Sequence, residues 1–199
     1  MSLMHILFRS LPRVLPATAV VVAAGCGSPF QLLPAVLENM IDTVQVNALQ
    51  GTPIGIPSGF DVAGRQAAFT ERGQDFDFAF DLTPEGVALV FPAPALGLDN
   101  GAGVWIADRP FADILEAPDR GFEVDSAVAV AVDTVFVIRS RSFSGSGIGD
   151  DCPFFIGSLP RYGKFRVLSI DLQTRVMELE TLINVNCGYR GLEVGLPTR

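Results

Sequence analysis

Hydrophobic and polar residues alternate along several short stretches of this chain, and a period of two predicts β-strands. The clearest stretch is 75–82, where apolar residues fall on one side and aspartates on the other. The apolar set is Phe76, Phe78, Phe80 and Leu82, and the opposite set is Asp75, Asp77, Ala79 and Asp81. Side chains alternate across a strand, so we expect one buried face and one solvent-exposed face. A turn over 83–86 then leads to a partner strand over 87–91.

A longer two-stranded ribbon is predicted near the C-terminus. One strand covers 164–171, a turn follows at 172–174, and the return strand covers 175–186. Alternation along the return strand divides it into two faces. Its predicted core face carries Met177, Leu179, Thr181, Ile183, Val185 and Cys187, and its mostly exposed face carries Val176, Glu178, Glu180, Leu182, Asn184 and Asn186.

The remaining stretches complete an all-β pattern. Further strands are predicted over 43–48, 61–70, 123–132 and 134–141. The sequence allows one short helix near 110–117, with Asp108 as its cap, Pro110 in its first turn and Pro118 at its end. Helix is too scarce for the crossovers of a parallel α/β sheet. We therefore predict an all-β protein, an antiparallel β-sandwich or barrel-like single domain of about eight to ten short strands.

The N-terminus has the three parts of a secretory signal. Arg9 and Arg13 supply positive charge, and the apolar run 14–24 is too short to span a bilayer as a helix. Small residues then precede a cysteine in Val22-Ala23-Ala24-Gly25-Cys26. This segment resembles the lipobox of bacterial lipoproteins. In layout, the rest of the chain loosely resembles small uncharacterised bacterial lipoproteins, and that resemblance carries no activity with it.

The lipobox resemblance implies a division of the chain into three parts. Residues 1–25 would be removed as a signal peptide, 26–42 would be a lipid anchor and tether, and 43–199 would form the β domain. Cys26 would carry a diacylglycerol and an N-acyl chain such as palmitate, and several chains anchor a protein firmly where one does not. Gly27 stands where an inner-membrane retention signal has Asp, which implies the outer membrane of the cell envelope. The alternative is a secreted protein with Cys26 free.

Charge and histidine content narrow the function classes. The formal net charge is −8, which argues against a nucleic-acid partner because phosphate binding needs clustered cations. The one histidine, His5, lies in the predicted signal. The mature protein would therefore lack histidine, which excludes Ser-His-Asp and Cys-His catalysis and the usual histidine-containing catalytic zinc sites. The sequence indicates no catalytic residue, no cofactor and no metal site.

The positive charges concentrate in the C-terminal third of the chain. Residues 26–135 hold 16 acidic and four basic residues, whereas 136–199 hold six acidic and eight basic residues. Either the two parts attract each other within one domain, or the basic residues face an acidic partner or lipid headgroups. The basic residues that we single out as candidate binding residues are Arg139, Arg141, Lys164 and Arg190.

Cys152 and Cys187 are the two cysteines that remain if Cys26 is lipidated. In an exported protein, two cysteines most simply form a disulfide, which would close a loop of about 35 residues at the base of the ribbon. A redox-active pair is the alternative, but the close C-x-x-C spacing is missing.

Two other groups of residues are candidates for ligand binding. Asp99 and Asp108 lie near Trp105, the one tryptophan, and an aromatic ring with carboxylates can hold a sugar or a cation. Tyr189 and Arg190 follow Cys187 directly, and a loop held rigid by a disulfide suits binding. The aspartates of 75–82 most simply form a solvated strand face, with a calcium site or a catalytic carboxylate pair as alternatives.

Three functional hypotheses follow. The first is a non-enzymatic envelope lipoprotein whose β domain binds an envelope protein partner or has a structural role. The second is a saccharide- or peptide-binding module built on Trp105 and Tyr189. The third is a carboxylate-dependent hydrolase. A concave pocket that holds Trp105 and two carboxylates would favour the second or the third.

Overall fold

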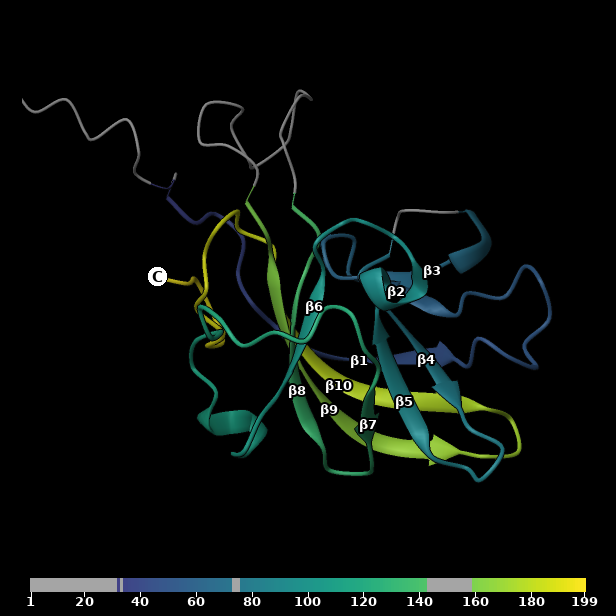
Figure 1. Cartoon of the computed structure of the whole chain (residues 1–199). Helices are drawn as coiled ribbons and strands as arrows, with labels where there is room; N and C mark the ends of the chain where they lie inside the picture. Colours follow the sequence, from purple (N-terminus) through teal and green to yellow (C-terminus); the bar gives the residue numbers. More distant parts are fainter. Residues whose placement is uncertain (1–31, 33, 73–75, 143–158) are drawn as a thin grey trace, which may run out of the picture.

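Two five-stranded antiparallel sheets pack face to face across a shared apolar core (Figure 1). The computed structural model describes residues 32, 34–72, 76–142 and 159–199. The first sheet has the order β1 (Ile41–Asn47), β10 (Val176–Asn184), β9 (Tyr162–Asp171), β8 (Val135–Arg139) and β6 (Gly103–Ile106). The second has the order β3 (Gln66–Ala68), β2 (Gly59–Asp61), β4 (Phe78–Leu82), β5 (Ala88–Pro92) and β7 (Val128–Val130). The predicted all-β sandwich is therefore confirmed, and the sheets do not close into a barrel.

Four phenylalanines from the two sheets meet at the centre of the core. Phe60 and Phe78 come from the second sheet, and Phe136 and Phe165 come from the first. The rings of Phe78 and Phe165 lie edge to face with centroids 5.2 Å apart, and Phe136 stacks on Phe165 at 5.3 Å. Such ring pairs stabilise a core beyond their buried area. The predicted inward face of 75–82 is confirmed, because Phe76, Phe78, Phe80 and Leu82 are all buried.

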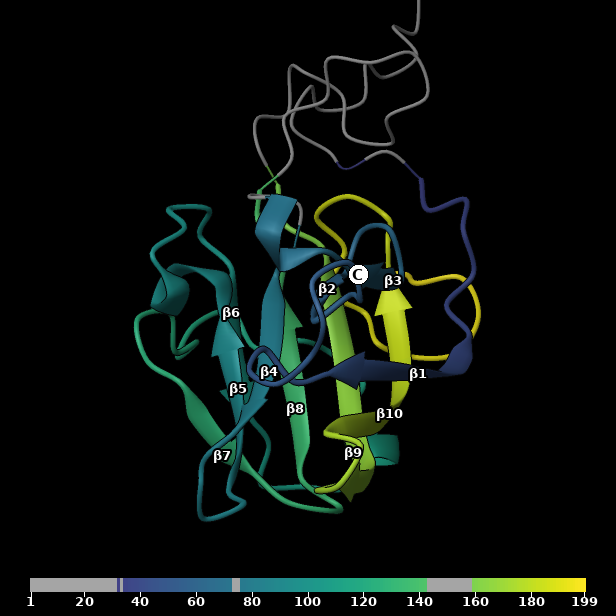
Figure 2. The same ribbon diagram turned by 90° about the vertical axis from the view of Figure 1, so that its right-hand side faces the viewer.

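The predicted ribbon is the pairing of β9 with β10, and it lies in the middle of the first sheet (Figure 2). Asp171 ends β9, and its carboxylate accepts hydrogen bonds from the backbone N–H groups of Gln173 and Thr174. The backbone and side-chain hydrogen bonds of Thr174, followed by the bond from Gln173, lower the pKa of the Asp171 carboxyl. Arg175 completes the turn with a φ of 58°. The predicted positions of both strands and of the turn therefore agree with the structure.

The polar face of the predicted strand 75–82 is not exposed to solvent. Asp77 is 0 % exposed and Asp81 is 6 % exposed, because Arg141, just after β8, and Arg175, in the turn between β9 and β10, pair with them. Asp75 lies outside the described residues. The prediction of a solvated aspartate face was wrong for Asp77 and Asp81, since a period-two pattern cannot show an ion pair formed far along the chain.

The far half of β10 is also buried on both faces. Met177, Leu179, Thr181 and Ile183 point into the core as predicted. On the other face, Leu182, Asn184 and Asn186 were predicted to be mostly exposed, but they are 1 %, 0 % and 3 % exposed. A third layer, formed by the segment between β6 and β7 and by the C-terminal tail, covers Leu182 and Asn184. Its apolar residues, including Phe111, Ile114 and Leu192, form a second core cluster with Leu182. The side chain of Asn186 is instead held by backbone hydrogen bonds of residues 36 and 37.

The helix predicted near 110–117 is a single 3-10 turn, η3 (Phe111–Asp113), with Pro110 rather than Asp108 at its N-cap. Ile114 already has extended backbone angles, and the chain continues as an extended segment. Leu115 accepts a hydrogen bond from the Leu192 N–H, and Ala117 donates one to the Arg190 carbonyl. These backbone bonds to the tail replace the bonds that a helix would make with itself.

Other strand boundaries differ modestly from the prediction. The stretch 61–70 contributes to a hairpin of β2 and β3, and 123–132 contributes β7 alone. The first strand begins at Ile41, and Asn39 already pairs with Gly195. Two further 3-10 turns are η1 (Thr70–Arg72) and η2 (Ala93–Leu96). Within the described ranges there is no helix with the length and apolar character needed to cross a bilayer.

Candidate functional site

The third layer leaves a cavity of about 470 Å³ beside Trp105 on the outer side of the first sheet. Trp105 lies in β6, where it pairs with Val137 of β8, and its half-buried ring packs against the second core cluster. The cavity wall opposite is the chain from Arg109 to Pro118. The charged residues that line the cavity are Arg109, Asp113, Glu116 and Arg190.

Arg190 holds the wall of this cavity in place. Its Nε donates a hydrogen bond to the Ala117 carbonyl at 2.9 Å, and its Nη2 donates to the same oxygen. The guanidinium also lies 3.6 Å from the Glu116 carboxylate, which in turn lies 3.5 Å from Arg199. The tail and the wall are therefore fixed to each other by charged groups that also face the cavity.

The arrangement combines an indole ring with two carboxylates and two guanidinium groups around one open concavity. An aromatic face offers stacking contact to an apolar ring surface, and charged groups at the edge offer directional hydrogen bonds. This combination suits a polar ring with hydroxyl groups, such as a saccharide. Asp113, Glu116 and Arg109 are exposed, so a ligand in the cavity can reach them.

The structure brings two of the predicted binding residues, Trp105 and Arg190, to this cavity. It does not bring the two predicted acids, Asp99 and Asp108, to the cavity. Asp99 is exposed in the loop before β6, and Asp108 is exposed and pairs with Arg109 at 3.2 Å. Tyr189 is partly buried, its N–H donates to the Asn186 carbonyl, and it does not line this cavity. The acids that do line it, Asp113 and Glu116, were missed because nothing in the local pattern distinguishes them.

Lys164 is a buried strut, not a surface cation. Only 4 % of the residue is exposed, and its ammonium donates hydrogen bonds of 2.9 Å to the carbonyls of both Phe111 and Ile114. The ammonium also lies 4.5 Å from the centre of the Phe111 ring. Burial lowers the pKa of Lys164, and the charges of Glu180 and Glu193 oppose that shift. Lys164 therefore fastens the third layer to β9.

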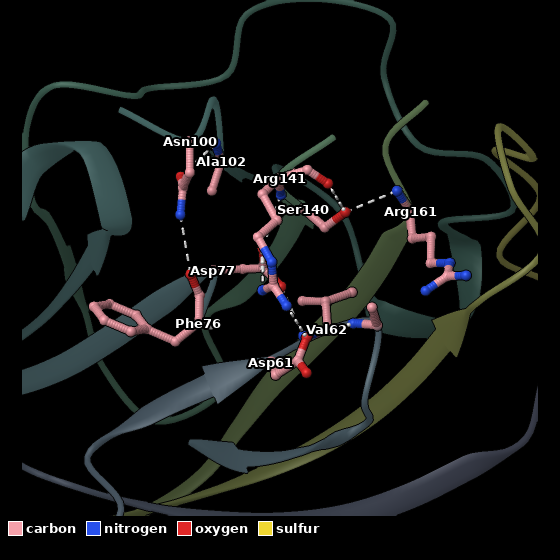
Figure 3. A network of polar contacts seen from close by, with 10 residues as sticks. Asp61, Val62, Phe76, Asp77, Asn100, Ala102, Ser140, Arg141 and Arg161 are labelled. Atoms are coloured by element: carbon pink, nitrogen blue, oxygen red, sulfur yellow. Dashed lines mark hydrogen bonds and ion pairs between the residues drawn. The ribbon is translucent and has the colours of Figure 1, made fainter. Parts of the chain in front are cut away.

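Arg141 lies in a buried ionic network between the two sheets (Figure 3). Its backbone N–H donates to Asp77 Oδ1 at 2.8 Å, and its guanidinium lies 3.2 Å from the carboxylates of both Asp77 and Asp61. Asp77 Oδ2 accepts a further bond from the Val62 N–H at 2.8 Å. Burial is the largest effect on Asp77 and raises its pKa to about 6, against the opposing influence of Arg141.

Ser140 and Asn100, which lie beside this network, are held by hydrogen bonds between their side chains and backbone groups. Ser140 Oγ accepts a hydrogen bond from the Arg161 N–H at 2.8 Å, which ties β8 to the start of β9 (Figure 3). The Asn100 side chain donates to the Phe76 carbonyl at 3.1 Å. The contact between Asp77 and Arg141 links the two sheets. Because Asp77 is fully buried, a substrate cannot reach its carboxylate.

The last predicted cation, Arg139, also makes framework contacts. Its Nη2 donates to the Gly101 carbonyl at 3.1 Å, and its guanidinium lies 5.0 Å from the centre of the Phe122 ring. The ion pairs of Arg141 and Arg175, not the contacts of Arg139, favour the interpretation that the basic third of the chain attracts the acidic remainder within one domain.

The cysteine predictions stay predictions. Cys26 and Cys152 lie outside the described residues. Cys187 is 7 % exposed, and its Sγ lies 4.0 Å from the Leu159 carbonyl. Cys187 lies in the turn that follows β10, and its burial agrees with the inward orientation that the sequence predicts.

Comparison with protein families and with curated proteins found no family model and no relative that matches this chain. The case for a function therefore depends on the sequence and on the geometry of the site.

Proposed function

We propose that this protein is a non-enzymatic lipoprotein of the bacterial outer membrane whose β-sandwich binds a saccharide in the cavity beside Trp105. The observation that carries the ligand proposal is the composition of that cavity, which combines Trp105 with Asp113, Glu116 and Arg190. The resemblance of residues 22–26 to a lipobox supports the membrane anchor, and the covalent lipid at Cys26 is the membrane partner.

A binding role accounts for the chemistry of the described acids better than hydrolysis does. Asp61 and Asp77 share Arg141, and Asp81 is 2.9 Å from Arg175, so these carboxylates serve the framework. Asp113 and Glu116 lie on one segment, three residues apart, on the same wall of the cavity. A glycosidase places its two carboxyls on either side of the scissile bond. We therefore propose saccharide recognition without cleavage.

Glycan-array binding tests the ligand proposal. The protein should retain a subset of glycans, and Trp105→Ala should abolish retention because the stacking surface is lost. Glu116→Gln should weaken retention, whereas Glu85→Gln, an exposed change in the turn between β4 and β5, should leave it unchanged. Release of shorter glycans from the array by the wild-type protein would contradict the non-enzymatic proposal.

Membrane fractionation tests the anchor proposal. The wild-type protein should fractionate with outer membranes and incorporate labelled palmitate. Cys26→Ser should remain unprocessed or become soluble, and it should incorporate no label. Unchanged membrane association of Cys26→Ser would contradict lipidation at this residue.

A further inference from the structure

The segment that leads into β1 is bound to the chain that follows β10. Asn186 Oδ1 accepts hydrogen bonds from the backbone N–H groups of Val36 and Leu37, and Asn186 Nδ2 donates to the Leu37 carbonyl. Asn39 exchanges two backbone hydrogen bonds, of 2.8 and 2.9 Å, with Gly195. The two segments lie side by side in both views (Figures 1 and 2), the lead in purple and the tail in yellow. From Val36 on, the segment predicted as a tether is therefore fixed to the β domain.

This pairing turns a group of aliphatic side chains outward. Asn39 is 0 % exposed and its amide donates to two backbone carbonyls of the tail, so its side of the pair faces the domain. Because side chains alternate along extended segments, the neighbours of Asn39 and Gly195 face the opposite way. These neighbours include Met40, Val194 and Leu196, which are 61 %, 67 % and 53 % exposed.

Ile41 continues the same surface. It is 53 % exposed, and it lines one shallow cavity together with Val194. Single exposed aliphatic residues are common on proteins, but four that adjoin on two paired segments indicate an interaction surface. We call Met40, Ile41, Val194 and Leu196 the aliphatic surface.

The predicted lipid anchor meets the domain beside the aliphatic surface. Cys26 precedes Val36 by ten positions. An extended chain covers at most about 3.6 Å per residue, so acyl chains on Cys26 would hold Val36 within about 36 Å of the bilayer. The hydrogen bonds of Asn186 and Asn39 fix Val36 close to Met40 and to the tail. A lipid surface is therefore the partner that the anchor brings to these side chains, and their burial would add apolar contact to the covalent anchor.

The described charged groups around the aliphatic surface hold no excess of cations. Glu38 is exposed, and Arg65 donates a hydrogen bond of 3.5 Å to its backbone carbonyl. Arg199 is paired with both Glu193 and Glu116. Attraction to anionic lipids needs clustered cations, so we expect the contact to depend on apolar burial among zwitterionic lipids.

We propose that the aliphatic surface docks on the lipid surface of the membrane that carries the Cys26 anchor. The inference rests on the proposed lipid anchor and does not depend on the saccharide site. It goes beyond anchoring because it states which face of the β-sandwich lies against the bilayer.

Tryptophan fluorescence of the lipidated protein in vesicles of phosphatidylethanolamine and phosphatidylcholine tests the proposal. In a Trp105→Phe background, Val194→Trp places the one indole on the aliphatic surface. Leu172→Trp is the matched control, because Leu172 is 58 % exposed and lies beyond the opposite end of β10. Phosphatidylcholine that is brominated on its acyl chains quenches an indole that it contacts. In brominated vesicles the Val194→Trp emission should shift to shorter wavelength and lose most of its intensity, and the Leu172→Trp emission should do neither.

Flotation of the vesicles separates this proposal from the anchor on which it rests. Val194→Trp protein that floats with the vesicles without being quenched would overturn the docking surface and leave the anchor standing. Equal quenching of the two variants would also overturn it, because no one face would then lie against the bilayer. Protein that does not float would overturn the anchor and the docking together. A shift that grows with the concentration of the soluble Cys26→Ser form of Val194→Trp, without vesicles, would show that a second copy covers the surface and would overturn the lipid contact.

Discussion

Asp77 and Arg141 form a two-point contact between the sheets, in which one carboxylate oxygen accepts both the backbone N–H and the guanidinium of an arginine 64 residues later. Asp77 is fully buried, whereas the Arg141 side chain is 15 % exposed. The contact places a titratable group in the interior of the sandwich, where burial works against its charge. Its effect on stability is therefore measurable through pH.

The raised pKa of Asp77 predicts that part of the free energy of unfolding is lost as the pH rises. The folded protein keeps the proton up to about pH 6, whereas the unfolded chain releases it near 3.8. Between these values the folded state binds more protons, so stability falls with rising pH, by about 3 kcal/mol over the whole window. Urea unfolding at pH 3.5 to 7 should show this fall relative to Asp77→Asn.

Asp42→Asn on exposed strand β1 is the matched control for that experiment. It should keep the pH dependence of the wild-type protein, because the change leaves Asp77 untouched. An Asp77→Asn profile parallel to the wild-type profile would contradict the assignment of this titration to Asp77.

Removing the partner arginine should be costly at neutral pH. Arg141→Met leaves Asp77 buried without its guanidinium, and breaking a buried pair in this way costs about 3–5 kcal/mol. In an Asp77→Asn background the same change should cost clearly less, which a double-mutant cycle by urea denaturation measures. Equal costs in the two backgrounds would show that the pair contributes no coupling.

Lys164 predicts a stability difference between two neighbouring cations on β9. Lys164→Met leaves the carbonyls of Phe111 and Ile114 without their donor and should cost about 1–3 kcal/mol. Arg166→Met breaks an ion pair whose arginine is 39 % exposed, and it should cost less than about 1 kcal/mol. Thermal unfolding of both variants measures which one loses more stability. A larger loss for Arg166→Met than for Lys164→Met would contradict the role of Lys164 in fastening the third layer to β9.

The predicted disulfide gives a fourth test. Cys152→Ser should lower the melting temperature and make the Cys187 thiol reactive toward an alkylating reagent under denaturing conditions, because the loop of about 35 residues loses its closure. Mass spectrometry after alkylation counts the thiols. Two alkylated thiols at these positions in the oxidised wild-type protein would contradict the disulfide.

Much of the fold was predictable from alternation alone. The ribbon of β9 and β10 and the inward row Phe76, Phe78, Phe80 and Leu82 follow from a period of two, because the sandwich core covers one face of each strand. The burial of Asp77 and Asp81 was not predictable. Each depends on an arginine that is 64 or 94 residues away in sequence, and no local pattern records that pairing.

The candidate site was predictable only in part. Trp105 and Arg190 were singled out by residue type and position, and both line one cavity. The acids of that cavity were missed because nothing in the local pattern distinguishes them. The segment that carries them was predicted as a helix, but it is an extended wall held by backbone bonds to the tail and by Lys164. Lys164 was predicted as a candidate binding residue, but it is buried because its ammonium donates hydrogen bonds to carbonyls of that wall.

The most direct test of the central claim is the intrinsic fluorescence of the purified protein, because Trp105 is its one tryptophan and lies in the proposed saccharide site. Titration with a glycan retained on the array should shift the emission to shorter wavelength and saturate, as the half-buried indole loses contact with water. Glu116→Gln should move the midpoint to higher glycan concentration. Emission that stays unchanged while that glycan binds would contradict a saccharide site beside Trp105.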